Sequence, residues 1–337
     1  MNGRGALRAP DGLGRVPAVE AEAAARPVRV LVTGATGVLG RWVAEGFAAL
    51  GDHVTTFPGR ELGVAGAGTG RALRRAVAEV DAVCHLAAAT PLQPGRRTDL
   101  TYARCNVDAT RLLLDAVAAT SGCRVVFAST AMVNGLGPTD TRRHSDRAAY
   151  AESKLIAEGL VEAYGCGVSL RFNALGGPRT PTDRGIVAAA LGAADENRPF
   201  EVYGDGSSGR DYLHVLDAAR AVVCAARRPV AGYRAVEIGS GRLSTIDAVI
   251  AAVERVTRRR VPRRHLPVRA DVDDRPACDL GPARAVLGWT PQRSDLATLV
   301  GDQWAEQRVP GTFSAGLRWT LDPSGRPLTV VAPRAGG

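Results

Sequence analysis

Tyr150 and Lys154 are spaced so that they could share one proton-transfer site. Lys154 is the only lysine in the chain, since the other 42 of the 43 Lys and Arg side chains are arginines. Side chains four residues apart lie on one face of a helix, so the ammonium can reach the phenol. A nearby positive charge favours the phenolate and lowers a pKa that starts near ~10. The spacing therefore offers Tyr150 as a general acid/base, although the same pattern also occurs on solvent-exposed helix faces.

A glycine-rich segment follows a short apolar run near the start of the chain. Residues 28–33 (VRVLVT) are apolar and β-branched, and TGATGVLG and an amphipathic segment over 38–50 follow at once. This order of strand, glycine turn and helix is typical of a dinucleotide site. Gly34 allows the tight turn, Gly37 lets the backbone approach a pyrophosphate, and Gly40 lets the helix pack close to the strand. The helix N-terminus then offers N–H groups to the phosphates.

Further strands and helices alternate along the first half of the chain. The sequence predicts strands at 53–57, 81–86, 124–128 and 168–171, and helices over about 100–119 and from about 150. This alternation predicts an α/β fold with a Rossmann-like, doubly wound parallel sheet. Thr130 comes just after a strand, and the carboxyl ends of such strands face the ligand crevice.

The second strand ends without the acidic residue that usually binds the adenosine ribose in an NAD site. Pro58, Gly59 and Arg60 stand there instead. Arg60 could pair with the 2′-phosphate of NADP, or it could simply be solvated. His85 lies in the third strand, and we expect it to be a packed or hydrogen-bonded histidine rather than a base.

Composition excludes several other classes of protein. The net charge is +9, but the arginines are spread along the chain, and the densest cluster, 258–264, has no interleaved aromatic residues. We therefore expect no nucleic-acid partner. No apolar run approaches the roughly 20 residues of a membrane span. The six cysteines are scattered without metal-ligand spacing, so we expect a reduced, cytoplasmic protein with no metal.

With TGATGVLG, the set Thr130, Tyr150 and Lys154 resembles the short-chain dehydrogenase/reductase superfamily. RFNALGGPR, VYGDGSSGRDYLHVLDAARA, VEIGSGRLSTI and VLGWTP resemble its extended branch, the NAD-dependent epimerase/dehydratase family of nucleotide-sugar enzymes. The resemblance covers about residues 28–300. It implies a catalytic triad of Thr130, Tyr150 and Lys154, NAD (or NADP) as cofactor, a nucleotide-diphosphate sugar as substrate, and a homodimer formed through helices near 100–119 and 150–164.

The resemblance also implies the residues that line each part of the site. Cofactor contacts would come from Gly34, Thr36, Gly37, Val38, Leu39, Arg60, Leu86, Ala87, Ala88, Asn106, Tyr150 and Lys154. Substrate contacts would come from Asn173, Tyr203, Arg210 and Arg269. Two arginines suit a diphosphate because guanidinium groups bind such oxygens with charge-assisted, bidentate hydrogen bonds.

The sequence divides into a tail at 1–26, a dinucleotide-binding domain at 27–175 with parts of 208–240, a substrate-binding domain at 176–207 and 241–310, and an extension at 311–337. The extension is expected to form two short strands around Asp322–Gly325, covering a sheet edge or meeting a partner. A weak capping box is expected at Ser244 and Asp247, and a closing helix near 295–307.

Three functions remain open from the sequence. The first is a 4-epimerase that transfers a hydride transiently between sugar C4 and a retained nicotinamide cofactor, with Tyr150 as acid/base. The second is a 4-ketoreductase of a deoxysugar nucleotide that consumes NADPH, which Arg60 favours. The third is a non-catalytic sensor of NAD(P). Dehydration is not expected, because Ala131 and Met132 stand where the family's 4,6-dehydratases have an acidic pair.

Overall fold

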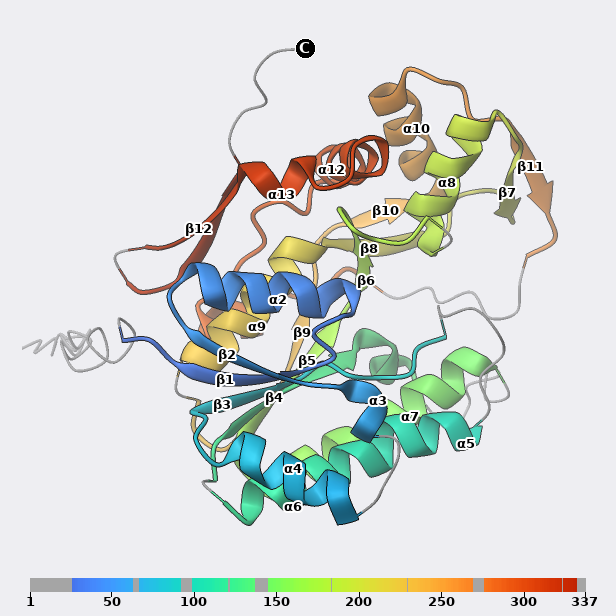
Figure 1. Cartoon of the computed structure of the whole chain (residues 1–337). Coiled ribbons are helices and arrows are strands. Elements are labelled where there is room, and N and C mark those ends of the chain that lie inside the picture. The colour runs from blue at the N-terminus through green and yellow to red at the C-terminus, as the bar shows by residue number, and fades with distance from the viewer. Residues whose placement is uncertain are drawn as a thin grey trace, which may run out of the picture.

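A six-stranded parallel sheet forms the centre of the molecule (Figure 1). The computed structural model describes residues 26–62, 67–91, 99–120, 122–136, 145–182, 184–228, 230–268, 276–322 and 324–331. The strands run in the order β2-β1-β3-β4-β5-β9. Their bounds are β1 Arg29–Thr33, β2 His53–Phe57, β3 Ala82–His85, β4 Arg124–Thr130, β5 Gly167–Phe172 and β9 Tyr233–Ile238. The α/β fold predicted from the sequence is confirmed.

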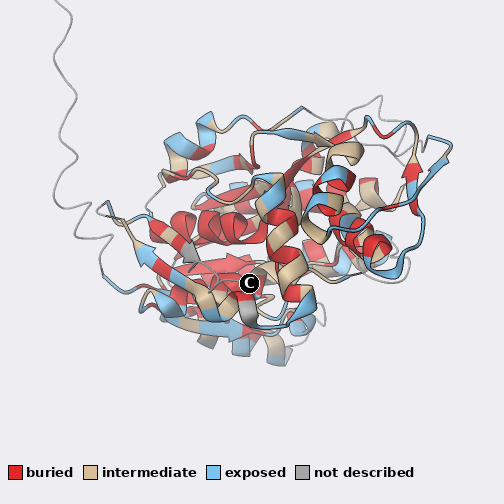
Figure 2. Ribbon diagram, turned by 90° about the horizontal axis from the view of Figure 1, so that it is seen from above, coloured by how far each residue is buried: buried red, intermediate tan, exposed pale blue. Residues whose placement is uncertain are grey.

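Helices cover both faces of this sheet. One face carries α2 (Val38–Ala49) and α9 (Val215–Arg227), and the other carries α4 (Ala67–Val77), α6 (Ala109–Ala118) and α7 (Asp146–Tyr164). Both faces of the strands are therefore buried, which explains why the strands are continuous apolar runs rather than alternating ones. Figure 2 shows this buried centre, with the exposed residues at the periphery.

The two strands on either side of β1 are reached by connections that run over opposite faces of the sheet. The chain reaches β2 through α2 on one face, and passes from β2 to β3 through α3 (Gly59–Leu62) and α4 toward the other. The strand order therefore reverses between β1 and β3, and ligands of such sheets bind at the carboxyl ends of the strands beside this point.

The expected helix over 100–119 is interrupted. It consists of α5 (Asp99–Tyr102), a π-helical turn η1 (Ala103–Asp108) and α6. Short π-helical segments are often found at functional sites. Neither the π-helical turn nor its position follows from the apolar periodicity.

A smaller part of the molecule is built mainly from the second half of the chain. Its core lies between α8 (Gly185–Glu196), α10 (Ile246–Thr257) and α12 (Leu296–Arg308). Two small sheets flank it: β10 (Leu243–Thr245), β8 (Gly209–His214) and β6 (Ala174–Gly176) form one, and β11 (Arg263–Leu266) and β7 (Phe200–Tyr203) form the other. Two short helices, η2 (Ala131–Gly135) and α11 (Gly281–Leu287), pack against the main part instead, η2 on α7 and β5, and α11 on β9 and α9.

Two helix starts in this part can be compared with the sequence. The expected closing helix is α12, and the Asp295 side chain caps it by accepting a hydrogen bond from Thr298 N. The expected cap at Ser244 is wrong by one residue: Thr245 caps α10 by accepting from Ala248 N at 3.1 Å. Ser244 instead lies in β10, where it pairs with β8.

The last described residues form an antiparallel hairpin. Its strands are β12 (Leu317–Leu321) and β13 (Pro327–Val331), on either side of the expected turn. Residues 312–316 before them form a short helix, α13, where the sequence suggested part of a strand. The hairpin packs on α2 and α9 and, within the described chain, pairs with no strand of the main sheet. Trp319 lies against Gly46 of α2.

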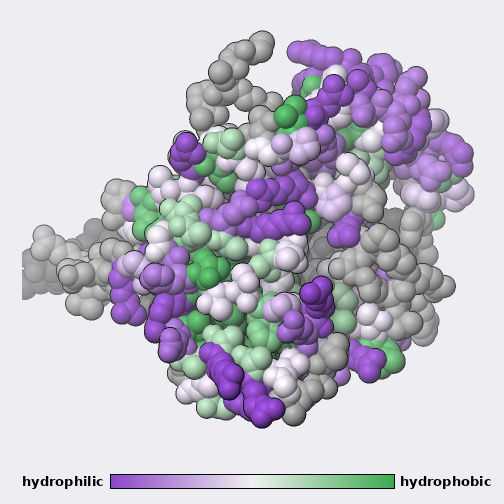
Figure 3. All heavy atoms as spheres, in the orientation of Figure 1, coloured by the Kyte–Doolittle hydropathy of each residue, from purple (hydrophilic) through white to green (hydrophobic). Residues whose placement is uncertain are grey.

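The cluster of arginines at 258–264 is largely paired with acids. Figure 3 shows the hydrophilic surface over β11 and α10. Acidic side chains lie around this cluster, and the ion pairs are Arg259–Asp195, Arg260–Glu254, Arg263–Asp247 and Arg264–Glu201. These exposed ion pairs are in keeping with the interpretation of this surface as solvated.

Three further findings bear on the chemistry. All six cysteines are free. Among the described residues, no group of three or more His, Cys, Asp and Glu side chains could hold a metal ion. None of the described helices is both long and apolar enough to cross a membrane.

Candidate active site

The glycine turn between β1 and α2 is closed by contacts that only glycine permits. Gly34 has φ +73°, and a Cβ added there would lie 2.6 Å from Ala87 N. A Cβ on Gly40 would lie 2.1 Å from the carbonyl oxygen of Gly34. These distances are far below van der Waals contact, so Gly40 is required for α2 to pack on the turn, and Gly34 for the segment after β3 to do so. A Cβ on Gly37 would meet only Gly34 O, at 3.2 Å.

The first turn of α2 is suited to binding an anion. Gly37 is its N-cap, no side chain caps it in the described chain, and its first turn contains no acidic residue. The first N–H groups of a helix have no partner within the helix and carry partial positive charge. The neighbouring Thr36 is exposed, and Val38 and Leu39 are half-buried. This arrangement fits a pyrophosphate.

The segment after β3 lies against the same turn. Ala87 N donates to Thr33 Oγ1 at 3.3 Å, and Leu86 N donates to Thr33 O. A Cβ on Gly59, just after β2, would lie 2.7 Å from Ala87 Cβ. The expected proximity of Leu86 and Ala87 to the glycine turn is therefore present, and Ala88 continues this segment. Arg60 is exposed beyond the end of β2.

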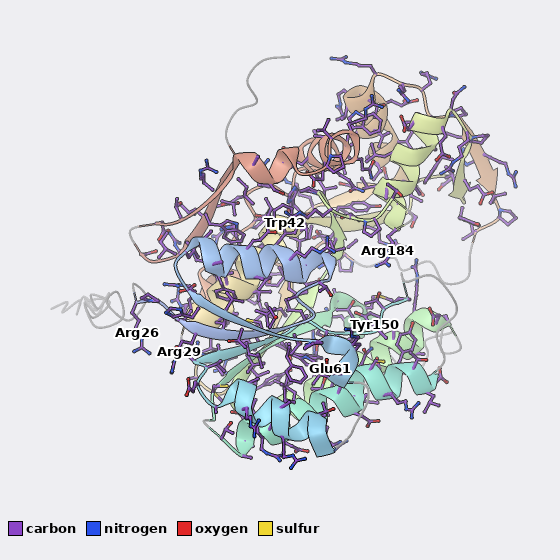
Figure 4. All side chains as sticks on the ribbon, viewed as in Figure 1. Arg26, Arg29, Trp42, Glu61, Tyr150 and Arg184 are labelled. Atoms are coloured by element: carbon purple, nitrogen blue, oxygen red, sulfur yellow. The ribbon has the colours of Figure 1, made fainter. Side chains whose placement is uncertain are left out.

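Helix α7 carries Tyr150 and Lys154 and has well-formed ends. Ser145 caps it by accepting from Ala148 N at 3.1 Å, and Gly165 ends it in the left-handed conformation. The Tyr150 ring lies 5.8 Å from that of Tyr102. Figure 4 shows Tyr150 below Arg184, which lies at the start of α8.

Lys154 is almost fully buried and reaches β4. It is 1% exposed, and its Nζ lies 4.0 Å from the centroid of the Phe127 ring. Thr130 lies three residues further along the same strand, is buried, and accepts from Met132 N at 3.3 Å. The fold thus joins the helix of Tyr150 and Lys154 to the strand that ends at Thr130.

The electrostatics differ from the expectation drawn from the spacing. Burial raises the pKa of the Tyr150 phenol, so the expected lowering by Lys154 is wrong for the chain alone. Burial also lowers the pKa of Lys154 to about 7, and the carboxylate of Glu158 offsets only part of this effect. A lysine with this pKa is only partly charged at neutral pH, which weakens its effect on the phenol.

Asn106 is buried in the π-helical turn and joins three segments. Its Oδ1 accepts from Ala89 N at 2.8 Å, while its Nδ2 donates to Ala89 O at 3.1 Å and to Ser153 Oγ at 2.9 Å. Ser153 in turn donates to Tyr150 O at 2.7 Å. Asn106 therefore fixes α7 against the segment after β3. Ser153 stands inside YAESK but was not among the predicted site residues.

A second polar network lies next to the site. Glu158 is 3% exposed and binds Arg171 through both carboxylate oxygens, with the shortest distance 2.6 Å. Arg171 also donates to Asn134 Oδ1, and Asn134 donates to Glu237 at 2.7 Å. Glu158 lies one turn after Lys154, and this i, i+4 spacing is the sequence pattern that could have indicated an acid beside the lysine.

The residues expected to bind substrate are only partly brought together. Asn173 follows β5, is 8% exposed, and donates to Glu237 Oε1 at 2.7 Å. Asn173 immediately precedes β6, whose register with β8 begins at Ala174 opposite Tyr212, two residues after Arg210. Arg210 donates to Gly209 O at 2.7 Å. Tyr203 lies in the separate β7–β11 sheet, and Arg269 lies outside the described residues.

Asp211 holds the loops around this region and was not predicted from the sequence. Its buried carboxylate accepts from Ser240 N and Oγ, Gly241 N and Cys278 N, at 2.6 to 3.1 Å. A Cβ on Gly239 would lie 2.7 Å from Asp211 Oδ2 and 2.9 Å from Asn173 Nδ2. The sequence signal was the RDY triplet, in which only the arginine was singled out.

The residues present fit a dinucleotide. The turn with Gly34 and Gly40 leaves room that a side chain would fill, beside a helix N-terminus suited to phosphate. Near the other end, the hydroxyl of Ser129 is buried without a hydrogen-bond partner in the described chain, one residue before Thr130. A buried hydroxyl without a partner is costly, and a polar group of a ligand would satisfy it.

Comparison with known proteins places the chain in a family. Residues 30–239 match the model of the NAD dependent epimerase/dehydratase family, and the chain belongs to this family. The UDP-glucose 4-epimerase of Streptomyces lividans is 29% identical over 313 residues, which cover 82% of this chain and 95% of that protein.

Two solved structures of similar proteins cover most of the chain. MoeE5 in complex with UDP-glucose and NAD is 28% identical, with a TM-score of 0.71, over 83% of this chain and 98% of that one. The UDP-glucose 4-epimerase from Brucella ovis in complex with NAD is 26% identical, with a TM-score of 0.69, over 83% and 98%.

Proposed function

We propose that this member of the NAD dependent epimerase/dehydratase family is a nucleotide-sugar 4-epimerase that retains NAD. The observation that carries the proposal is the glycine turn closed against Ala87, in a segment that Asn106 joins to the helix bearing Tyr150 and the buried Lys154. The Streptomyces lividans relative, which covers 82% of the chain, is a UDP-glucose 4-epimerase; MoeE5 binds UDP-glucose and NAD, and the Brucella ovis enzyme binds NAD. The substrate class is accordingly a UDP-sugar or a similar nucleotide-diphosphate sugar.

The proposed mechanism assigns one role to each member of the triad. Tyr150 takes the proton of the C4 hydroxyl and later returns it. Thr130 donates a hydrogen bond to the oxygen on which negative charge develops. The chemistry supplied by bound NAD is hydride transfer to and from C4. Lys154 stabilises the Tyr150 phenolate, and it would also hold the nicotinamide ribose.

The Lys154 amine can act only while it is protonated. Its pKa of about 7 means that this charge depends on the oxygens around it. A hydroxyl or phenolate within hydrogen-bonding distance favours the ammonium and raises that pKa. We therefore propose that ligand binding raises the pKa of Lys154, and that the resulting ammonium lowers the pKa of Tyr150 as the spacing alone suggested.

The substrate contacts are proposed from position. Arg210 is half-buried in β8, the strand that pairs with β6 just after Asn173, and its guanidinium suits a diphosphate. Asn173, Tyr203 and Arg269 are proposed as further contacts. The division into a dinucleotide-binding domain (27–175 with parts of 208–240) and a substrate-binding domain (176–207 and 241–310) is also a proposal, which the separate core between α8, α10 and α12 supports.

We also propose a homodimer and a cytoplasmic location. Leu100 on α5 and Leu155 and Ile156 on α7 are apolar side chains that are 63%, 42% and 56% exposed. Exposed apolar patches often mark contacts between proteins. The free cysteines support a reducing compartment. Ile156→Asp should lower the mass measured by light scattering to that of one chain; an unchanged mass would contradict this interface.

One observation favours the NADPH-dependent 4-ketoreductase as a second candidate. Arg60 is exposed just beyond β2, where an NAD enzyme usually has an acid. A reductase would bind NADPH more tightly than NADH, and Arg60→Ala would erase the preference.

The test begins with the nucleotide in the purified protein. Denaturation should release NAD, and Tyr150→Phe should abolish epimerisation of UDP-glucose while retaining the nucleotide. An empty protein that prefers NADPH would support the reductase. Activity that survives in Tyr150→Phe would show the proposed mechanism to be wrong.

A further inference from the structure

His85 is buried at the end of β3 and is used by neither the proposed reaction nor a metal site. It is 1% exposed. Its Nδ1 lies 2.7 Å from Thr33 Oγ1, and its Nε2 lies 3.0 Å from Thr110 Oγ1. The imidazole therefore connects the strand before the glycine turn with the helix that follows the π-helical turn.

The direction of each hydrogen bond can be derived from the two hydroxyl groups. Thr110 Oγ1 donates its hydrogen to Asn106 O at 2.6 Å, so toward His85 it can only accept. His85 Nε2 must therefore carry a hydrogen. If the ring is neutral, Nδ1 is an acceptor, and the Thr33 hydroxyl donates to it while accepting from Ala87 N.

The ring is neutral for two reasons. Burial, together with the charge on Lys154, lowers the pKa of His85 to about 3. A protonated ring would also turn Nδ1 into a donor and leave the Thr33 hydroxyl hydrogen without its acceptor. His85 also packs on the Phe127 ring, with ring centroids 5.7 Å apart, and it is this Phe127 ring that the Lys154 ammonium faces.

The hydrogen bonds then form a path that passes through Asn106, reaching its backbone carbonyl and continuing from its side chain. It runs from Ala87 N–H through Thr33, His85 and Thr110 to Asn106, and the side chain of Asn106 continues it to Ala89 and through Ser153 to Tyr150 O. The path begins at the residue that touches Gly34 and ends on the backbone of the proposed acid/base.

We propose that His85, as the neutral Nε2–H tautomer, is a positioning residue that fixes the cofactor-side segment 87–89 and the Tyr150 helix relative to each other. The part of the proposal that concerns turnover rests on the proposed epimerase function, whereas the tautomer and the effect on nucleotide binding do not. Because a displacement of about 1 Å at a reacting centre can cost about 100-fold in rate, such a link is expected to affect turnover.

The first experiment reads the tautomer directly. NMR of the ring nitrogens in protein labelled with ¹⁵N-histidine should show, for His85, a neutral Nε2–H ring that stays unprotonated down to pH 5. The five histidines of the chain make assignment practical, and the signal should vanish in His85→Asn. An Nδ1–H tautomer, or a ring that becomes protonated near pH 6, would overturn the proposal.

The second experiment separates positioning from stability. His85→Leu should bind NAD about ten-fold more weakly and turn over UDP-glucose at least ten-fold more slowly, with an unchanged KM for the sugar nucleotide. His85→Asn keeps one donor and one acceptor, and should recover part of both losses. A lower unfolding temperature with wild-type NAD binding and kcat would mean that His85 is only structural.

Two threonine variants provide the same test if His85→Leu does not fold. Thr33→Val and Thr110→Val each break one link and should show the same loss of NAD affinity. Thr257→Val is the matched control, since Thr257 also donates to the carbonyl four residues earlier, at 2.8 Å, but in α10. If wild-type protein binds NAD but does not turn over UDP-glucose, the proposed function fails, while the NMR and NAD-binding results still decide the role of His85.

Discussion

Replacing Lys154 by methionine should make the protein more stable, and the gain should depend on pH. Burial lowers the pKa of this lysine from 10.5 to about 7. One unit of pKa corresponds to about 1.4 kcal/mol, so folding with a charged Lys154 costs about 5 kcal/mol. The sign follows from proton binding: between pH 7 and 10.5 the unfolded chain holds this proton more tightly, so the stability of the wild type rises with pH.

The assay is urea unfolding of nucleotide-free protein, followed by tryptophan fluorescence at pH 7, 8 and 9. Comparing wild type with Lys154→Met cancels the titration of other groups. The advantage of the variant should shrink by about 2 kcal/mol between pH 7 and 9. Lys154→Arg stays charged throughout, and should be less stable than Lys154→Met at each pH. Parallel pH profiles for wild type and Lys154→Met would refute the reasoning.

Two further predictions concern the glycine turn and the neighbouring ion pair. Gly40→Ala should weaken NAD binding at least ten-fold (on the order of 1.4 kcal/mol), because its Cβ would lie 2.1 Å from the Gly34 carbonyl oxygen. Gly68→Ala is the control: a Cβ there would meet no atom within 4 Å, so NAD affinity should stay unchanged. Calorimetry measures the NAD affinity of both variants. Glu158→Gln should cost about 2 kcal/mol in unfolding free energy, since Arg171 loses a charge-assisted partner. It should also move the pH profile of activity to lower pH, because the pKa of Lys154 falls further without the Glu158 carboxylate. Normal NAD affinity in the first variant, or an unmoved profile in the second, would contradict these expectations.

The sequence predicted those parts of the fold that depend on local patterns. The turn at Gly34 and Gly40 could be located because glycines at this spacing, between a strand and a helix, form a specific fingerprint of a nucleotide-binding turn. The π-helical turn that holds Asn106 could not be predicted, since it depends on tertiary packing rather than on periodicity. The same holds for α13.

The sequence predicted the helix that carries Tyr150 and Lys154, but not the electrostatics of these two side chains. The i, i+4 spacing correctly placed Tyr150 and Lys154 on one helix, but it carries no information about burial, and burial controls both pKa values. The partners of Asn106 and His85 come from segments far apart in the sequence. Such pairings appear only once the strands are placed side by side.

The most direct test of the epimerase proposal uses UDP-glucose that carries deuterium at C4. We expect UDP-galactose that retains the deuterium at C4, formed without added nucleotide, because the hydride leaves and returns within one site. No epimer at all, or deuterium that appears in NADPH or NADH free in solution, would contradict it.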